Sequence, residues 1–199
     1  MSPPTSTPID LANLRVDAAD AALVVVDVQT KLSAVMAPEA MAACERNLLV
    51  LIELARRLGW PVVWSEQYVK GLGPTRPAIE AALTAPGLVV ARFEKLAFAC
   101  TDDEPLRAAL PGLGRKTFVV AGMEAHVCVW QTARGLRELG HRVFVPGDAV
   151  ISRDPSNRAV GLALATAAGA VVSSTEVIAF DALGRAGTDD FRAISRLLK

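Results

Sequence analysis

The sequence lacks an excess of either charge and has no long apolar runs. Its 21 Lys and Arg residues balance 21 Asp and Glu residues, so the formal net charge is zero. No run of basic residues stands out, so the electrostatic signature of a protein that binds nucleic acid or an anionic membrane is missing. The longest apolar runs, such as 21-AALVVV-26, fall far short of the roughly 20 residues that a membrane-spanning helix needs. We therefore expect a small-molecule partner, and neither a nucleic acid nor a membrane.

Cysteine and histidine are also scarce. The three cysteines, Cys44, Cys100 and Cys128, are odd in number and have no C-x-x-C spacing. This favours free thiols in a reducing compartment over a disulfide framework, and predicts a cytoplasmic protein. The two histidines, His126 and His141, are too few for a zinc site built on histidines, so no metal is expected.

The glycine motifs that bind phosphate groups are missing as well. The turn after the first predicted strand, 27-DVQTKL-32, has no glycine, so the G-x-G-x-x-G cradle for a pyrophosphate is absent there. The P-loop pattern is absent too. The stretch 70-KGLGPT-75 has glycines but follows the second strand and contains a Pro, which is typical of a rigid loop. We therefore expect no cofactor.

What the sequence does have is a regular alternation of strands and helices. Nearly continuous apolar runs predict strands that are buried on both faces. Between them apolar residues recur every three or four positions, as Met41, Cys44 and Leu48 do. This alternation predicts an α/β protein of three layers, α/β/α, with a mostly parallel, six-stranded, Rossmann-like open sheet. The predicted strands are 21–27, 61–66, 87–93, 117–122, 142–147 and 170–174.

The chain is predicted to form a single domain. Its 199 residues, of which 52% are hydrophobic, suffice for one sizeable core, and no linker or low-complexity stretch divides it. The first ten residues, MSPPTSTPID, have no Lys, no Arg and no apolar segment, so neither a signal nor a transit peptide is expected there. We predict a disordered or loosely ordered tail over residues 1–18 and the domain over residues 19–199.

Three side chains that could act as acid, base or nucleophile follow the ends of predicted strands, where open parallel sheets bind their ligands. Asp27 comes directly after the first strand, Lys95 after the third, and Cys128 on the segment after the fourth. A carboxylate directly after a buried run is costly unless it is paired or solvated, although Asp also caps helices. Lys95 could equally be a surface charge beside Glu94.

Cys128 is predicted to lie in the first turn of a helix. A helix N-terminus favours an anion, and a nearby Lys lowers the pKa of a thiol further, so we expect a stabilised thiolate. A buried, inert cysteine is the common alternative, and it is the one assigned to Cys44 and Cys100. His126 is only two residues from Cys128, so their side chains point to different sides of the helix and a Cys–His pair is not expected.

Four motifs resemble those of the isochorismatase-like cysteine hydrolase superfamily. The segment 65-SEQYVKGLGPT-75, together with 122-GMEAHVC-128, is similar to the isochorismatase domain-containing branch. The resemblance extends from about Leu23 to about Ile178. The motifs are 23-LVVVDVQTKL-32, 92-RFEKLAFACT-101, 121-AGMEAHVCVWQTA-133 and 145-VPGDAVISR-153.

The resemblance implies an Asp-Lys-Cys triad, with Cys128 as nucleophile, Asp27 as the base that takes its proton, and Lys95 as the charge that holds both. It also implies a cis peptide between Met123 and Glu124, with backbone N–H groups of this loop and of Cys128 directed toward an oxyanion. Relatives are commonly homo-oligomers, which implies a dimer or tetramer.

Three differences from other members of this superfamily restrict the implied activity to hydrolysis of a carboxamide-type C–N bond through a Cys thioester. The segment after the second strand has no histidine, unlike the metal site of nicotinamidases. Ala125 stands where many relatives have Thr, and Cys128 stands where isochorismatases proper lack the nucleophile. A binding protein without turnover, or a thiol redox sensor in which Cys100 pairs with Cys128, remains the alternative.

The candidate substrate pocket is formed by Gln29, Tyr68, Phe98 and Trp130, of which Phe98 and Trp130 could equally be core residues.

Overall fold

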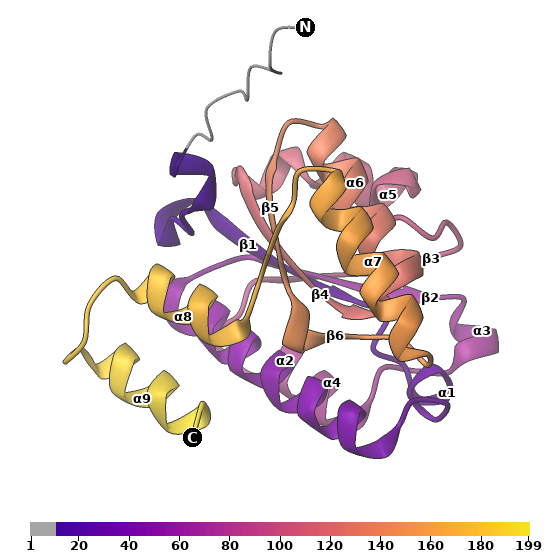
Figure 1. Ribbon diagram of the computed structural model, residues 1–199, viewed down its shortest axis with the longest axis horizontal. Coiled ribbons are helices and arrows are strands. Elements are labelled where there is room, and N and C mark those ends of the chain that lie inside the picture. The colour runs from indigo at the N-terminus through magenta and orange to yellow at the C-terminus, as the bar shows by residue number, and fades with distance from the viewer. Residues whose placement is uncertain (1–10) are drawn as a thin grey trace, which may run out of the picture.

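The apolar runs form a central sheet in the computed structural model, which describes residues 11–199. Helices cover both faces of the sheet (Figure 1), all strand pairs are parallel, and the order is β3-β2-β1-β4-β5-β7, with β6 paired to β4. The predicted three-layer architecture is confirmed. The strands are β1 (Ala21–Val26), β2 (Val62–Gln67), β3 (Val90–Lys95), β4 (Thr117–Met123), β5 (Arg142–Pro146), β6 (Val150–Ile151) and β7 (Val171–Ser173).

Over residues 11–199 the sheet has seven strands rather than the six predicted. The additional strand is β6, which pairs with Gly122 and Met123. Strand β5 pairs with β4 only as far as Val119, and the 3-10 turn Gly147–Ala149 then brings the chain back to β4. A two-residue strand is too short to leave a period in the sequence, which is why the pattern did not predict it.

The helices form two layers with separate cores (Figure 1). The long helix α2 buries the predicted stripe of Met41, Cys44, Leu48 and Leu51, and ends at Gly59 in a left-handed conformation. One layer comprises α2 (Pro38–Leu58), α4 (Pro77–Leu83), α8 (Thr175–Leu183) and α9 (Asp189–Leu197). The other comprises α5 (Glu104–Ala109), α6 (Trp130–Glu138) and α7 (Pro155–Ala167), while α1 (Thr30–Ser33) and α3 (Val69–Leu72) are short.

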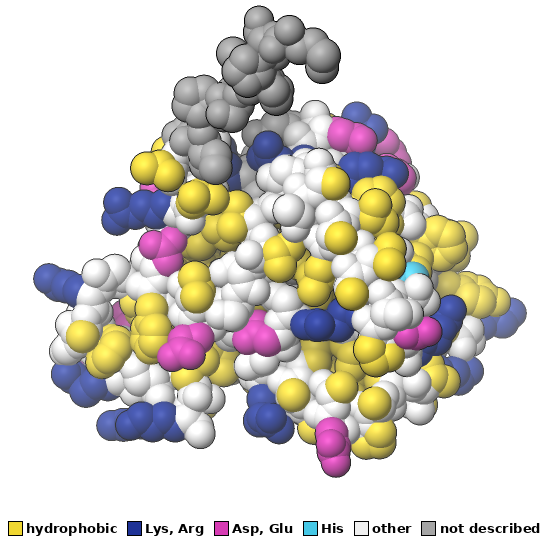
Figure 2. All heavy atoms as spheres, in the orientation of Figure 1, with side chains coloured by type: hydrophobic (Ala, Val, Ile, Leu, Met, Phe, Trp, Pro, Cys, Tyr) yellow, Lys and Arg dark blue, Asp and Glu magenta, His cyan; other side chains and the backbone are white. Residues whose placement is uncertain are grey.

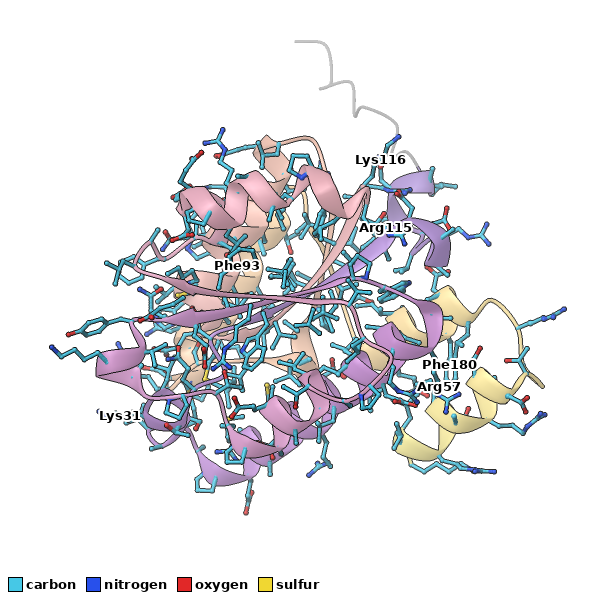
Figure 3. All side chains as sticks on the ribbon, turned by 180° about the vertical axis from the view of Figure 1, so that it is seen from behind. Lys31, Arg57, Phe93, Arg115, Lys116 and Phe180 are labelled. Atoms are coloured by element: carbon cyan, nitrogen blue, oxygen red, sulfur yellow. The ribbon has the colours of Figure 1, made fainter. Side chains whose placement is uncertain are left out.

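The two ends of the sheet carry different connections. Figure 3 shows Lys31, on α1 just after β1, at the opposite end of the molecule from Arg115 and Lys116, which precede β4. Since all strands are parallel, the segments after β1, β3 and β4 meet at the end marked by Lys31. None of the helices in residues 11–199 is long and apolar enough to cross a membrane.

The predicted tail is only partly within the described residues, because residues 1–10 lie outside them. Residues 11–14 form a 3-10 helix. Val16 is buried, and its N–H donates to Asp181 Oδ2 at 2.5 Å, while Trp60 Nε1 donates to the Ala18 carbonyl at 2.8 Å. Packing against the domain therefore begins before the boundary expected at residue 19.

Candidate active site

Asp27 lies directly after β1 and is fully buried. Its backbone has a positive φ of 51°, a conformation that Asp tolerates better than most residues. The neighbouring strand β4 comes very close here, since a Cβ on Gly122 would lie 2.1 Å from the Val26 carbonyl oxygen. Asp27 Oδ1 accepts a hydrogen bond from Ser65 Oγ at 2.7 Å, and Oδ2 accepts one from Lys95 Nζ at 2.8 Å.

Lys95, the last residue of β3, is only 1% exposed. Besides Asp27, its ammonium group donates to Gln67 Oε1 at 2.6 Å and to the carbonyl oxygens of Ala97 and Phe98 at 3.2 and 3.0 Å. The alternative of a surface lysine is therefore excluded. An ammonium group with this many acceptors is held in one place, next to the Asp27 carboxylate.

The charge of Lys95 is stabilised by its neighbours. Burial lowers the pKa of Lys95, but the charge of the Asp27 carboxylate and its hydrogen bond to Nζ raise it, and the net pKa is raised. The side chain therefore stays protonated at neutral pH, and a buried Lys–Asp ion pair lies at the bottom of the site.

Cys128 lies in a π-helical turn, Ala125–Val129, that precedes α6. It is 5% exposed, and it lines the same cavity as Asp27. Burial raises the pKa of the Cys128 thiol and Asp27 raises it further, while Lys95 lowers it by less. The predicted lowering of this pKa is therefore wrong, because burial of the thiol beside a carboxylate outweighs the nearby ammonium group. Cys128 is therefore a protonated thiol at neutral pH.

The loop between β4 and the π-helical turn contains the cis peptide bond Met123–Glu124. The buried Glu124 side chain accepts the Arg153 N–H at 3.0 Å and Arg153 Nη1 at 3.1 Å. His126 Nδ1 lies 3.0 Å from Ser152 Oγ, so this histidine contacts the segment after β6.

A cavity of about 270 Å³ opens over Asp27 and Cys128. A larger cavity of about 520 Å³ lies beside β7, but neither Asp27, Lys95 nor Cys128 lines it. Among the described residues, no group of three or more His, Cys, Asp or Glu side chains is arranged to hold a metal ion. The walls of the smaller cavity are Asp27, Leu32, Gln67, Leu72, Phe98, Glu124, Val127, Cys128 and Arg153.

Only Phe98 of the four predicted pocket residues lines this cavity within the described chain. Gln29 is turned inward, where its amide pairs with the backbone of Gln67 at 2.7 and 3.0 Å. The Tyr68 ring is turned over Gly71. The Trp130 ring lies against the Arg134 guanidinium, 5.0 Å from it. Within the described chain, none of these three side chains is a wall of the cavity.

Several residues that line the cavity were not predicted from the sequence. Leu32 and Leu72 lie on the segments after β1 and β2, and their position beyond strand ends was a usable signal. Gln67, the last residue of β2, contributes through the hydrogen bond to Lys95. Arg153 follows the short strand β6; it ends the motif 145-VPGDAVISR-153, but that motif assigned no role in the pocket to it.

Comparison with known proteins places the chain in a family. A model of the isochorismatase domain matches residues 21–177, and the chain belongs to this family. It is 35% identical over 151 residues to the "Secreted isochorismatase effector Isc1" of Phytophthora sojae, covering 75% of this chain and 71% of that protein. It is 33% identical over 150 residues to isochorismatase domain-containing protein 2 of Bos taurus, covering 75% and 70%. The resemblance to the isochorismatase domain-containing branch is confirmed.

Isochorismatase domain-containing protein 1 of Salmo salar is 35% identical over 149 residues, but the match spans 51% of its length. Among solved structures, the MAR1 ribonuclease of Caenorhabditis elegans has a TM-score of 0.82 at 29% identity, covering 92% of both chains. YcaC of Pseudomonas aeruginosa, with hexane-2,5-diol and covalent acrylamide, has a TM-score of 0.81 at 25% identity, covering 95% and 92%. The family and the fold support a hydrolase.

Proposed function

We propose that the protein hydrolyses a carboxamide-type C–N bond of a small molecule through a thioester on Cys128. The observation that carries the proposal is the buried Lys95–Asp27 ion pair at a cavity that Asp27 and Cys128 line together. An acid–base group in contact with a nucleophile, itself held by a third group, is the arrangement that nucleophilic catalysis requires.

In the proposed reaction, Asp27 accepts the thiol proton as Cys128 Sγ attacks the amide carbonyl carbon. The C–N bond of the tetrahedral intermediate then breaks, and the amine leaves with the proton from Asp27. Water next attacks the thioester while Asp27 accepts one of its protons. The C–S bond breaks, the thiol recovers a proton, and the carboxylic acid is released.

The oxyanion of each tetrahedral intermediate requires hydrogen-bond donors. We assign this role to backbone N–H groups of the loop that begins at the cis peptide Met123–Glu124, together with the N–H of Cys128. Loss of one such donor in other acyl-transfer sites costs about 3 to 4 kcal/mol of transition-state stabilisation. Burial raises the pKa of the Cys128 thiol, so the thiol keeps its proton until attack and the reaction needs a base, a role that Asp27 in the same cavity can take.

Size and charge of the cavity favour a small, uncharged amide. Its volume of about 270 Å³ is below the roughly 300 to 1,000 Å³ of sites for drug-sized ligands. Within it, Asp27 is paired with Lys95 and Glu124 with Arg153, so the formal charges cancel. The YcaC neighbour carries covalent acrylamide, and because acrylamide bonds to nucleophiles at its vinyl carbon, this adduct supports a nucleophilic side chain on this fold.

Other functions have weaker support. The name of the MAR1 neighbour describes a ribonuclease, but this chain has a formal net charge of zero, and Figure 2 shows Lys and Arg interspersed with Asp and Glu on the visible face. An RNA backbone is bound through an excess of positive charge. A peroxide-sensing thiol is disfavoured because the thiolate is the reactive form, whereas the pKa values of Cys128 and Cys100 are both raised, mainly by burial.

The test is a screen of small uncharged amides for release of ammonia or amine, with intact-mass analysis of the protein during turnover. We expect an acyl adduct on the wild type, and none on Cys128→Ala or Asp27→Asn. Cys44→Ala, which removes another buried thiol, is the matched control and is expected to remain active. Hydrolysis that persists in Cys128→Ala would rule out the thioester. If neither turnover nor an adduct occurs in the wild type, a binding protein becomes the better interpretation.

We also propose that the protein is a cytoplasmic homo-oligomer, a dimer or tetramer. The three cysteines are free and buried, which suits a reducing compartment. Val160 and Leu164 on the outer side of α7 are 53% and 39% exposed, and an exposed apolar helix face suits an interface between copies. Light scattering coupled to size-exclusion chromatography tests this prediction, and a monomer at micromolar concentration would contradict it.

A further inference from the structure

A second buried thiol lies close to Asp27 and takes no part in the proposed reaction. Cys100, in the 3-10 turn after β3, is 1% exposed. Its Sγ lies 3.5 Å from Ser65 Oγ, and Ser65 Oγ donates to Asp27 Oδ1 at 2.7 Å. Within the described chain, neither Ser65 nor Cys100 is a wall of the cavity. These groups therefore reach Asp27 from a side that substrate does not occupy.

The direction of the hydrogen bonds in this chain is fixed by the groups present. The Asp27 carboxylate accepts only, so the Ser65 hydroxyl proton points to Asp27 and the Ser65 oxygen is left to accept from the Cys100 thiol. Burial raises the pKa of Cys100 and the Asp27 charge raises it further, so the thiol keeps the proton that it donates. The Cys100 backbone N–H in turn donates to Thr132 Oγ1 on α6 at 2.9 Å.

Ser65 also holds the backbone of Asp27. The Asp27 N–H donates to the Ser65 carbonyl oxygen at 3.1 Å, so one residue of β2 binds both the main chain and the carboxylate. The groups that face Asp27 come from four elements: Ser65 on β2, Lys95 on β3, Cys100 on the turn after β3, and Cys128 on the π-helical turn.

A single partner would leave the carboxylate poorly oriented. The terminal torsion of Asp is broad and roughly two-fold, so a bond from Lys95 to one oxygen allows the carboxylate to turn. The structure has a different donor on each oxygen, Ser65 on Oδ1 and Lys95 on Oδ2. Two donors from two strands fix the plane of the carboxylate relative to Cys128.

We propose that Ser65, oriented by the Cys100 thiol, is the positioning residue that sets the orientation and basicity of Asp27 in the proposed hydrolysis. The inference rests on the proposed function, because it gives Ser65 a role only if Asp27 is the base. Ser65 touches no substrate, and its effect passes entirely through the Asp27 carboxylate.

The test follows alkylation of Cys128 by iodoacetamide as a function of pH, with the modified peptide quantified by mass spectrometry. In Ser65→Ala the ionised Asp27 carboxylate loses one hydrogen-bond donor. The acidic limb of the plot of rate against pH is therefore expected to shift to a pH about one unit higher, a tenfold change in the proton equilibrium. Cys100→Ala is expected to shift the limb in the same direction by less, whereas Cys100→Ser keeps a donor and restores the wild-type profile. Cys44→Ala, a buried thiol outside this chain, is the control and leaves the profile unchanged.

The outcomes separate this inference from the proposed function. If Asp27→Asn abolishes the acidic limb while Ser65→Ala and Cys100→Ala match the wild type, Ser65 is not a positioning residue and the hydrolase proposal is unaffected. If Asp27→Asn leaves the limb in place, Asp27 is not the base and both ideas fail. Circular dichroism checks folding of each variant. Should Ser65→Ala not fold, the comparison of Cys100→Ala with Cys100→Ser decides, and identical profiles for these two refute the inference.

Discussion

Replacing Lys95 by Met tests whether the buried ion pair holds the site together. Met has a similar length and no charge, so the substitution removes the ammonium group while filling most of its volume. The Asp27 carboxylate, which lies 2.8 Å from Nζ and is fully buried, then has no opposite charge next to it. Gln67 Oε1, which accepts from Nζ at 2.6 Å, also loses its donor.

The expected loss of stability follows from these contacts. At 2.8 Å and an effective dielectric constant of about 20, Coulomb's law gives roughly 6 kcal/mol of attraction. The cost of removing both charges from water opposes this gain. Breaking a buried pair by removing one partner therefore destabilises proteins by about 3 to 5 kcal/mol. For a chain of 199 residues this corresponds to a decrease in Tm of roughly 6 to 20 °C.

Urea unfolding followed by tryptophan fluorescence, which the three Trp residues allow, measures the change in the free energy of unfolding. Lys31→Met is the matched control, since Lys31 is exposed on α1 and its replacement is expected to change stability by no more than about 0.5 kcal/mol. The double variant Asp27→Asn with Lys95→Met removes both charges and is expected to recover most of the loss. A loss below about 1 kcal/mol in Lys95→Met would refute the reasoning. A double variant as unstable as the single one would place the cost in packing and not in the unpaired charge.

Two further predictions follow from the same region. A Cβ on Gly161 of α7 would lie 2.5 Å from the Ala125 carbonyl carbon and oxygen. Gly161→Ala is therefore expected to lower stability by about 1 to 3 kcal/mol and to slow alkylation of Cys128. The control Gly112→Ala adds a methyl group in open space and is expected to change neither the stability nor the alkylation rate. The free energy of unfolding should also fall as the pH rises above about 9, the pKa of a thiol in the unfolded chain. In the folded protein the pKa of Cys128 is raised by burial and that of Lys95 by Asp27. Both groups therefore contribute their full stabilisation below their unfolded pKa values, and this stabilisation is lost as the pH rises through their folded pKa values. Urea midpoints between pH 7 and pH 10.5 measure this effect, and a flat profile, or an equal slope in Cys128→Ala, would contradict it.

The layers of the fold, and the end of the sheet where the candidate site lies, could both be predicted from the amino-acid sequence. Val-rich runs buried on both faces require a parallel sheet covered by helices, and parallel strands bring their carboxyl ends to one edge. Asp27, Lys95 and Cys128 follow three such ends, so their proximity could be predicted without coordinates. In the structure Lys95 Nζ indeed lies 2.8 Å from Asp27 Oδ2.

Which side chains face the cavity, and whether Cys128 carries a charge, depend on contacts between distant segments and could not be predicted from the sequence. Gln29 follows β1 as Asp27 does, yet the backbone of Gln67 draws its amide inward, and Arg153 reaches the cavity from a strand too short to leave a sequence pattern. The thiol pKa is the sum of burial, which raises it, and opposing charges from two other strands, and these terms exist only once the chain is folded. The same holds for Ser65: a position on a buried strand predicts that its hydroxyl is enclosed, but that it donates to Asp27 depends on how β1 and β2 are aligned in the sheet.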